Sequence, residues 1–273
     1  MHILGVPLVV TTLTAGLEVS LCILLYVRRG YQRLPLFSAY VAVALANILV
    51  IGVVYLSFGF QSRVSFYAYW IASGVQIMAR SFAIAELCRY KLRAYRGIWS
   101  LTCIVLLTLT VLFLTHASID AYGQSYWIKS FVLTVERDLG ITSAVILLAV
   151  LLIRNYYGLE FDAFPKQIAM GMCILCLVEA VGNTIMRQAI LGYMQDWSHL
   201  RPLVDNIYTF WAGVHSAGFL ISLGVWCFAL RKTLPASAPD PVLLPVETYG
   251  QLSPQINFQL RAINQRLLEM LKP

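Results

Sequence analysis

Four polar residues stand near the middle of long apolar runs, where ionisable side chains are rare. Glu18, Arg80 and Glu179 carry charge, and Asn47 carries a neutral amide. A charge at bilayer depth costs roughly 2.5–3.5 kcal/mol on insertion scales, so such a residue usually faces a partner or a cavity. Counted along their helices, all four fall in one central layer. If they point inward, either Glu18 or Glu179 pairs with Arg80, and the other takes up a proton or binds a cation.

A second polar layer is expected nearer the outer side of the membrane. The run 129–153 carries Glu136-Arg137-Asp138, and the helical period turns Arg137 away from the two acids. His215 adds an imidazole from the last apolar run. Both features have a structural alternative. A histidine on an apolar helix is often only a hydrogen-bonded packing residue, and one member of the triplet can face lipid headgroups.

One helix face joins the two layers. Glu179, Asn183 and Arg187 are spaced by four residues, which places them on the same side of a helix. We therefore expect a polar crevice that opens outward, ends near Arg80 and binds a small or charged ligand. Two alternatives stay open: Arg187 can extend to the interface, and an Arg80–Glu179 pair can be a structural clasp without a ligand. The expected ligand-binding residues are Glu18, Asn47, Arg80, Glu136, Asp138, Glu179, Asn183, Arg187 and His215.

Long apolar helices must position these side chains. Hydrophobic residues make up 59% of the 273 residues and charged residues only 12%, which is about half the share in a soluble domain. A soluble fold of this length could not cover so much apolar surface, and a spanning helix needs about 20 apolar residues. The expected fold is an all-α integral membrane protein with a seven-transmembrane-helix bundle in residues 1–232. The spans are expected at 4–27, 36–58, 66–88, 97–116, 129–153, 166–188 and 207–230.

The charge of the connecting segments predicts the direction of the spans. Basic residues concentrate around Arg28, Arg89, Arg154 and Arg231, and the alternate segments hold few. Lysine and arginine mark the cytosolic side, and tryptophan and tyrosine collect at the opposite ends as an interfacial belt. We therefore expect the N-terminus outside and the C-terminus in the cytosol, in the plasma (inner) membrane. Glu86, at the basic edge, is expected to pair with Arg89 one turn away.

The C-terminal part of the chain predicts a linker and a short amphipathic helix. Residues 233–252 are rich in proline and small residues, which indicates an extended cytosolic linker. Residues 253–273 carry an apolar stripe, and a helix this short is not stable alone. It is expected to dock on a cytosolic or membrane protein partner, pair with a second copy, lie on the lipid bilayer or pack on the protein's own loops. The expected partner-binding residues are Ile256, Leu260, Ile263 and Leu267.

Motifs of enzymes, cofactors and nucleic-acid binding are missing from the sequence. It contains no Gly-x-Ser-x-Gly, no His-Glu-x-x-His and no phosphate-binding glycine loop, so we expect neither catalysis nor a cofactor or metal. Cys173-x-x-Cys176 lies within an apolar run without a second pair, which favours a packing role and predicts no disulfide. The net charge of +7 comes from short loops, where membrane topology explains it better than a nucleic-acid partner.

In helix count and direction the expected bundle resembles seven-helix receptors and microbial rhodopsins. The run 207–230 contains no lysine, which excludes a retinal Schiff base. Cys88-Arg89-Tyr90 lacks the acid that begins the acid-Arg-Tyr triplet of G-protein-coupled receptors. No specific family is assigned on these grounds.

Three functions remain as hypotheses. The leading one is a membrane sensor or receptor-like protein that binds its ligand in the outward crevice and signals through the cytosolic tail. The second is a small-solute or ion-coupled transporter in which helices 1–3 and 5–7 are parallel repeats around helix 4. Its basis is the similarity of Tyr67-Ala68-Tyr69-Trp70 to Tyr208-Thr209-Phe210-Trp211. The third is a non-catalytic subunit or scaffold of a membrane complex, and a homo-oligomer is compatible with all three.

Overall fold

The computed structural model describes residues 5–60, 62–92, 96–124, 126–157, 163–195 and 201–231, together with residues 262, 265, 266 and 269. This described part is helical and contains no strand. The helices are α1 (Gly5–Val27), α2 (Gly30–Arg33), α3 (Pro35–Phe58), α4 (Arg63–Leu92), α5 (Arg96–Ala121), α6 (Trp127–Tyr157), α7 (Ala163–Gln195) and α8 (Arg201–Ala229).

Some of the sequence predictions fall outside the described residues. These are the linker at 233–252 and the side chain of Arg187. The predicted partner-binding residues Ile256, Leu260, Ile263 and Leu267 also lie outside them.

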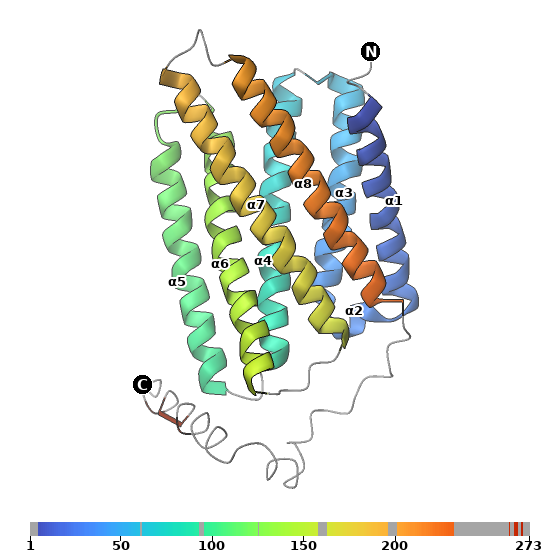
Figure 1. Ribbon diagram of the computed structural model, residues 1–273, viewed down its shortest axis with the longest axis vertical. Helices are drawn as coiled ribbons and strands as arrows, with labels where there is room; N and C mark the ends of the chain where they lie inside the picture. The colour runs from blue at the N-terminus through green and yellow to red at the C-terminus, as the bar shows by residue number, and fades with distance from the viewer. Residues whose placement is uncertain are drawn as a thin grey trace.

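The long helices lie side by side, and their connections alternate between the two ends of the bundle (Figure 1). Each apolar run expected from the sequence lies along one of them. Among the described residues, five stretches are long and apolar enough to cross a membrane: Pro35–Phe58, Arg63–Tyr90, Trp99–Ala121, Ala163–Ile185 and Ala212–Ala229. The chain is therefore an all-helical, multi-pass membrane protein.

The two other long helices differ from these five in the described residues. In α1 the side chains are described over the apolar segment Thr12–Val27, and the helix from Gly5 to Val27 carries one charged residue, Glu18. In α6 the charged triplet Glu136-Arg137-Asp138 interrupts the apolar sequence. Charge at bilayer depth is costly, so the partners of this triplet matter for the topology.

Large apolar side chains point outward over much of the bundle. Leu56 is 90% exposed, and Leu107 is 68% exposed. In water such a surface would drive association, whereas in a bilayer it contacts acyl chains of the same polarity. The outward apolar surface therefore agrees with the assignment of membrane spans.

Small residues bring α7 and α8 close together. Gly171 lies against the indole of Trp226, and a Cβ added to Gly171 would overlap that ring. Gly218 leaves room for Val178, whose Cγ1 would lie 2.6 Å from a Cβ at that position. The Trp226 indole N–H donates to the carbonyl of Ile168 at 3.2 Å. Close backbone approach at small residues is a common way to hold helices together where the hydrophobic effect is absent.

The start of α3 is capped by a carboxylate from α4. Glu86 accepts hydrogen bonds from the backbone N–H groups of Leu36, at 3.0 Å, and Phe37, at 2.8 Å. The first N–H groups of a helix have no partner within the helix, and a negative charge is favourable there. The predicted interaction of Glu86 with Arg89 is thus only part of the surroundings of this carboxylate. Two helix-terminal donors without an intrahelical partner hold the carboxylate, and the charge of the exposed Arg89 also acts on it.

Candidate functional site

Arg80 of α4 lies at the centre of a buried group of charges. Its side chain is 6% exposed, and its Nη1 forms an ion pair with Glu179 of α7. Its Nη2 lies 4.0 Å from Oε1 of Glu136 on α6. The helices α4, α6 and α7 pack against one another, which brings together residues far apart in the sequence. Of the two acids expected beside Arg80, Glu179 is the direct partner.

Asn183 completes what we call the Arg80 cluster (Arg80, Glu136, Glu179 and Asn183). It lies one turn beyond Glu179 on α7, and its Nδ2 donates to Oε2 of Glu136 at 2.9 Å. The spacing by four residues thus places Glu179 and Asn183 on one face of α7, toward α4 and α6.

The two carboxylates of the Arg80 cluster are held unequally. The side chain of Glu179 is 7% exposed and pairs directly with Arg80. The side chain of Glu136 is 15% exposed, and its 4.0 Å separation from Arg80 exceeds the length of a hydrogen bond. One guanidinium therefore faces two carboxylates, and one negative charge is uncompensated when both acids are ionised. Glu136 is the acid more open to an incoming cation.

Two further side chains lie around the Arg80 cluster. His215 of α8 is within electrostatic reach of Glu136 and Arg80. Cys176 of α7 is buried and within reach of the same two residues. The helix α8 thus contributes an imidazole to the surroundings of the cluster.

Tyr40 of α3 lies between the Arg80 cluster and α1. It is 1% exposed, and Arg80, Gln76 and Glu18 act on its hydroxyl group electrostatically. Gln76 approaches the hydroxyl, but no described group meets it in hydrogen-bonding geometry. The sequence analysis did not select Tyr40, because a tyrosine near the end of a span is usually an interfacial anchor. Its spacing of seven residues from Asn47, which puts both on one face of α3, is the signal that could have revealed it.

Glu18 of α1 is buried but stands apart from Arg80. Glu18 is 1% exposed, and its Oε2 has no hydrogen-bond partner among the described groups. The helix α1 packs mainly against α3 and α8, not against α4. Glu18 is therefore not an ion-pair partner of Arg80, and Tyr40 lies in the field of both.

Asn47 connects α3 to α4, and its described hydrogen bonds go to residues other than Arg80. Its Nδ2 donates to the carbonyl of Ala72 at 2.9 Å and to Oε1 of Gln76 at 3.3 Å. Gln76 lies one turn before Arg80 on α4. The role of Asn47 is to hold the helix that carries the guanidinium.

Asp138 belongs to a separate group that faces α5, the α5–α6 triad (His116, Arg137 and Asp138). Oδ1 of Asp138 accepts a hydrogen bond from Nε of Arg137 at 2.7 Å, and Oδ2 lies 2.9 Å from Nδ1 of His116. The prediction that Arg137 turns away from Asp138 is wrong, because a long arginine side chain can bend back to its neighbour. His116 was not among the expected site residues.

Two residues of one helix thus serve different partners. Glu136 and Asp138 are separated by about 200° around α6, so the first faces α4 and α7 and the second faces α5. The sequence analysis placed both in one crevice. The structure divides them between the Arg80 cluster and the α5–α6 triad.

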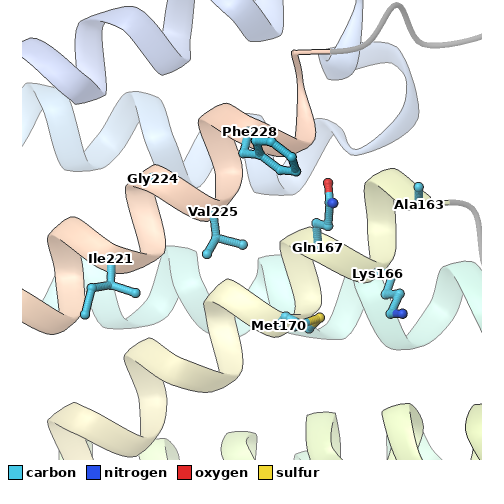
Figure 2. Close-up of a pocket in the computed structure, with 8 residues that line it drawn as sticks. All are labelled: Ala163, Lys166, Gln167, Met170, Ile221, Gly224, Val225 and Phe228. Atoms are coloured by element: carbon cyan, nitrogen blue, oxygen red, sulfur yellow. The ribbon is translucent and has the colours of Figure 1, made fainter.

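An open pocket in the described part lies elsewhere, between α7 and α8 near the end of the bundle where α7 begins (Figure 2). It does not include Arg80 or Glu136. Among the described residues, no three His, Cys, Asp or Glu side chains gather as possible metal ligands.

Comparison of the chain with protein-family models, with curated proteins and with solved structures finds no match. The function is therefore inferred from the chemistry of the Arg80 cluster and from its place in the bundle.

Proposed function

We propose that this chain is a membrane sensor that binds a monovalent cation, a proton included, at Glu136. The observation that carries the proposal is the unequal hold on the two carboxylates that share Arg80. Glu179 is paired directly, whereas Glu136 is more exposed and 4.0 Å from the guanidinium. A single positive charge at Glu136 would neutralise the cluster.

The proposed topology has seven crossings of the plasma (inner) membrane. Its support is that the charged residues within α6 have partners. Glu136 accepts a hydrogen bond from Asn183, and Asp138 accepts one from Arg137. Pairing of this kind lowers the cost of placing charged side chains at bilayer depth. With α1 and α6 included, each of the long helices crosses once.

The proposed direction places the N-terminus outside and the C-terminus in the cytosol. Arg28 follows α1, Arg89 lies near the end of α4, Lys166 lies in the first turn of α7 and Arg231 follows α8. Alternating helix directions bring these four residues to one end of the bundle (Figure 1). Basic residues are retained on the cytosolic side.

A cation at Glu136 would change the forces between three helices. Neutralised Glu136 attracts Arg80 less, so Arg80 pairs with Glu179 alone and α6 is held less firmly to α4. The helix α4 also carries Glu86, whose carboxylate caps α3 at the proposed cytosolic end. A shift of α4 would therefore reach the cytosolic surface, where the tail is the proposed output.

The test uses the full chain in lipid nanodiscs, with protons, sodium and methylammonium as probes. Intrinsic tryptophan fluorescence and the thermal unfolding midpoint are measured against probe concentration. We expect a saturable change with at least one probe, and we expect Glu136→Gln to abolish it. Asp138→Asn is the matched control and keeps the response, because Asp138 belongs to the α5–α6 triad. A wild-type protein that responds to none of the probes, or an unchanged response in Glu136→Gln, overturns the proposal.

An ion-coupled carrier is the second candidate, and Glu18 is the observation that favours it. Glu18 and Arg80 both act on Tyr40, and Glu136 lies 4.0 Å from Arg80. Glu18 has an oxygen without a described hydrogen-bond partner. Chains of ionisable groups inside a bundle are typical of proton-coupled transport. In proteoliposomes with a pH-sensitive dye inside, a carrier moves protons and Glu18→Gln stops the movement. A sensor shows the cation response without flux.

A further inference from the structure

A groove between α7 and α8 opens on the side of the bundle, near its basic end. Its volume is about 660 Å³, and it does not overlap the Arg80 cluster. From α7 it is lined by Lys166, Gln167 and Met170, and from α8 by Ile221, Val225 and Phe228. Figure 2 shows the side chain of Gln167 directed toward Phe228, whereas the side chain of Lys166 extends away from α8 in this view.

The groove changes from polar to apolar along its length. Lys166 and Gln167 lie in the first turns of α7, which begins at Ala163. Ile221 lies eight residues before the end of α8, which corresponds to a depth of about 12 Å along that helix. Met170 is 41% exposed and Ile221 is 56% exposed, and both lie on membrane spans, so this part of the groove is open to the acyl chains of the bilayer. A polar end and an apolar wall fit an amphiphilic ligand that approaches from within the bilayer.

Among the residues that the structure describes, Lys166 is the charged side chain that lines the polar end. Lys166 forms none of the salt bridges found among the described residues. Arg231, which is exposed, follows Phe228 by three residues and adds a second cation at the same end. Arg231 does not line the groove, so Lys166 is the lining cation that complements a phosphate group.

Space for a chain comes from a glycine in α8. Gly224 lines the groove, and a Cβ added to it would meet no atom within 4 Å. This glycine thus differs from Gly171, where the indole of Trp226 fills the space. The room at Gly224 is open to the surroundings of the helices.

We propose that this groove binds one anionic phospholipid of the surrounding membrane. Its phosphate would lie at Lys166 and Gln167, and one acyl chain would lie along Met170, Val225 and Ile221. A lipid bound there would bridge α7 and α8 at the proposed cytosolic end. The proposal requires the membrane embedding of α7 and α8 and does not depend on a cation at Glu136.

The test is native mass spectrometry of the full chain in detergent, with added phosphatidylglycerol or phosphatidylcholine of equal chain length. We expect one tight site with a preference for phosphatidylglycerol. Lys166→Gln should weaken that binding about fivefold, which is the effect of one basic residue beside anionic lipid. Gly224→Leu should weaken the binding of both lipids, because the added side chain occupies part of the space along which the acyl chain would lie.

Two variants serve as matched controls. Lys129→Gln makes the same change at a lysine on α6, and Gly52→Leu makes the same change at a glycine of α3 that also has no atom within 4 Å of an added Cβ. Both should bind phosphatidylglycerol as the wild type does. Equal binding of the two lipids, unchanged binding in Gly224→Leu, or displacement of phosphatidylglycerol by equimolar inorganic phosphate overturns the proposal.

Discussion

Asn183 and Glu136 are joined across the contact between α6 and α7 by a hydrogen bond of 2.9 Å, from Nδ2 to Oε2. This bond positions the more exposed acid of the Arg80 cluster, while Arg80 holds Glu179 directly. The amide donates a hydrogen bond to the carboxylate and transfers no proton, so Glu136 keeps the charge that the proposed cation would meet. The stability of the α6–α7 contact should therefore depend on the chemistry of residue 183.

The first prediction concerns substitutions of Asn183. Asn183→Ala removes the hydrogen bond and should lower the free energy of unfolding by about 1.5–3 kcal/mol, the usual value for a bond to a charged group. Asn183→Asp should lower it further, because a third carboxylate then lies beside Glu136. Thermal unfolding in nanodiscs measures both. Thr184→Ala is the control, since that hydroxyl donates only to Ala180 of its own helix, at 2.7 Å. An Asn183→Asp protein as stable as the wild type would contradict the geometry of the cluster.

The second prediction ranks two ways of breaking the Arg80 cluster. Arg80→Leu leaves both Glu136 and Glu179 without a cation and should cost about 3–5 kcal/mol, as expected when a buried pair loses one partner. Glu179→Gln should cost less, because Arg80 then still has Glu136 at 4.0 Å. The measured quantity is the fraction of monodisperse protein that survives heating. Adding Glu179→Leu to Arg80→Leu should recover part of the loss. If Glu179→Gln lowers the surviving fraction more than Arg80→Leu does, Glu136 does not interact with the guanidinium of Arg80.

The third prediction tests the cap on α3. Glu86→Ala removes the acceptor of the Leu36 and Phe37 amides and should cost about 1–2 kcal/mol, as the loss of a helix cap does. Hydrogen exchange at those two amides should become faster. Glu86→Gln keeps one carbonyl oxygen and should have an intermediate effect. Arg89→Ala should leave both amides largely protected, because Arg89 acts on the carboxylate through its charge and not through these two hydrogen bonds. Exchange as fast as in Glu86→Ala would contradict the cap.

The fourth prediction concerns the contact between α7 and α8. Gly171→Ala places a methyl group in the space of the Trp226 indole and should break the indole hydrogen bond to Ile168. Such overpacking typically costs about 1–3 kcal/mol, which outweighs the gain in helix propensity. Gly52→Ala is the control and should be neutral or slightly stabilising, because nothing lies within 4 Å of its new methyl group. Equal unfolding midpoints for the two variants would show that Trp226 is not tightly packed.

The lengths of the apolar runs located the helices but not their ends. The run 166–188 lies within α7, which extends to Gln195, and the run 66–88 lies within α4, which begins at Arg63. A helix continues into polar sequence as long as its backbone hydrogen bonds are satisfied, whereas the apolar pattern ends at the membrane interface. The pattern therefore predicts the span and underestimates the helix.

The members of the candidate site were predicted with uneven success. Arg80 and Glu179 were expected as partners, and they are joined in the structure. Tyr40 and His116 were not selected, because each stands near the end of a span, where polar and aromatic residues are common. Their partners lie on other helices, and a single sequence does not state which helices are neighbours.

Sequence alone determined that the chain is helical, embedded in a membrane and charged at a few interior positions, because those properties follow from local composition and the 3.6-residue period. Tertiary structure decided which charges meet. It separated Glu136 from Asp138, moved Glu18 away from Arg80 and brought Glu86 to the start of α3. The physical reason is that an ion pair depends on the rotation and the neighbours of each helix. Close contacts at residues such as Gly171 establish these relations between helices, and no single run of sequence contains them.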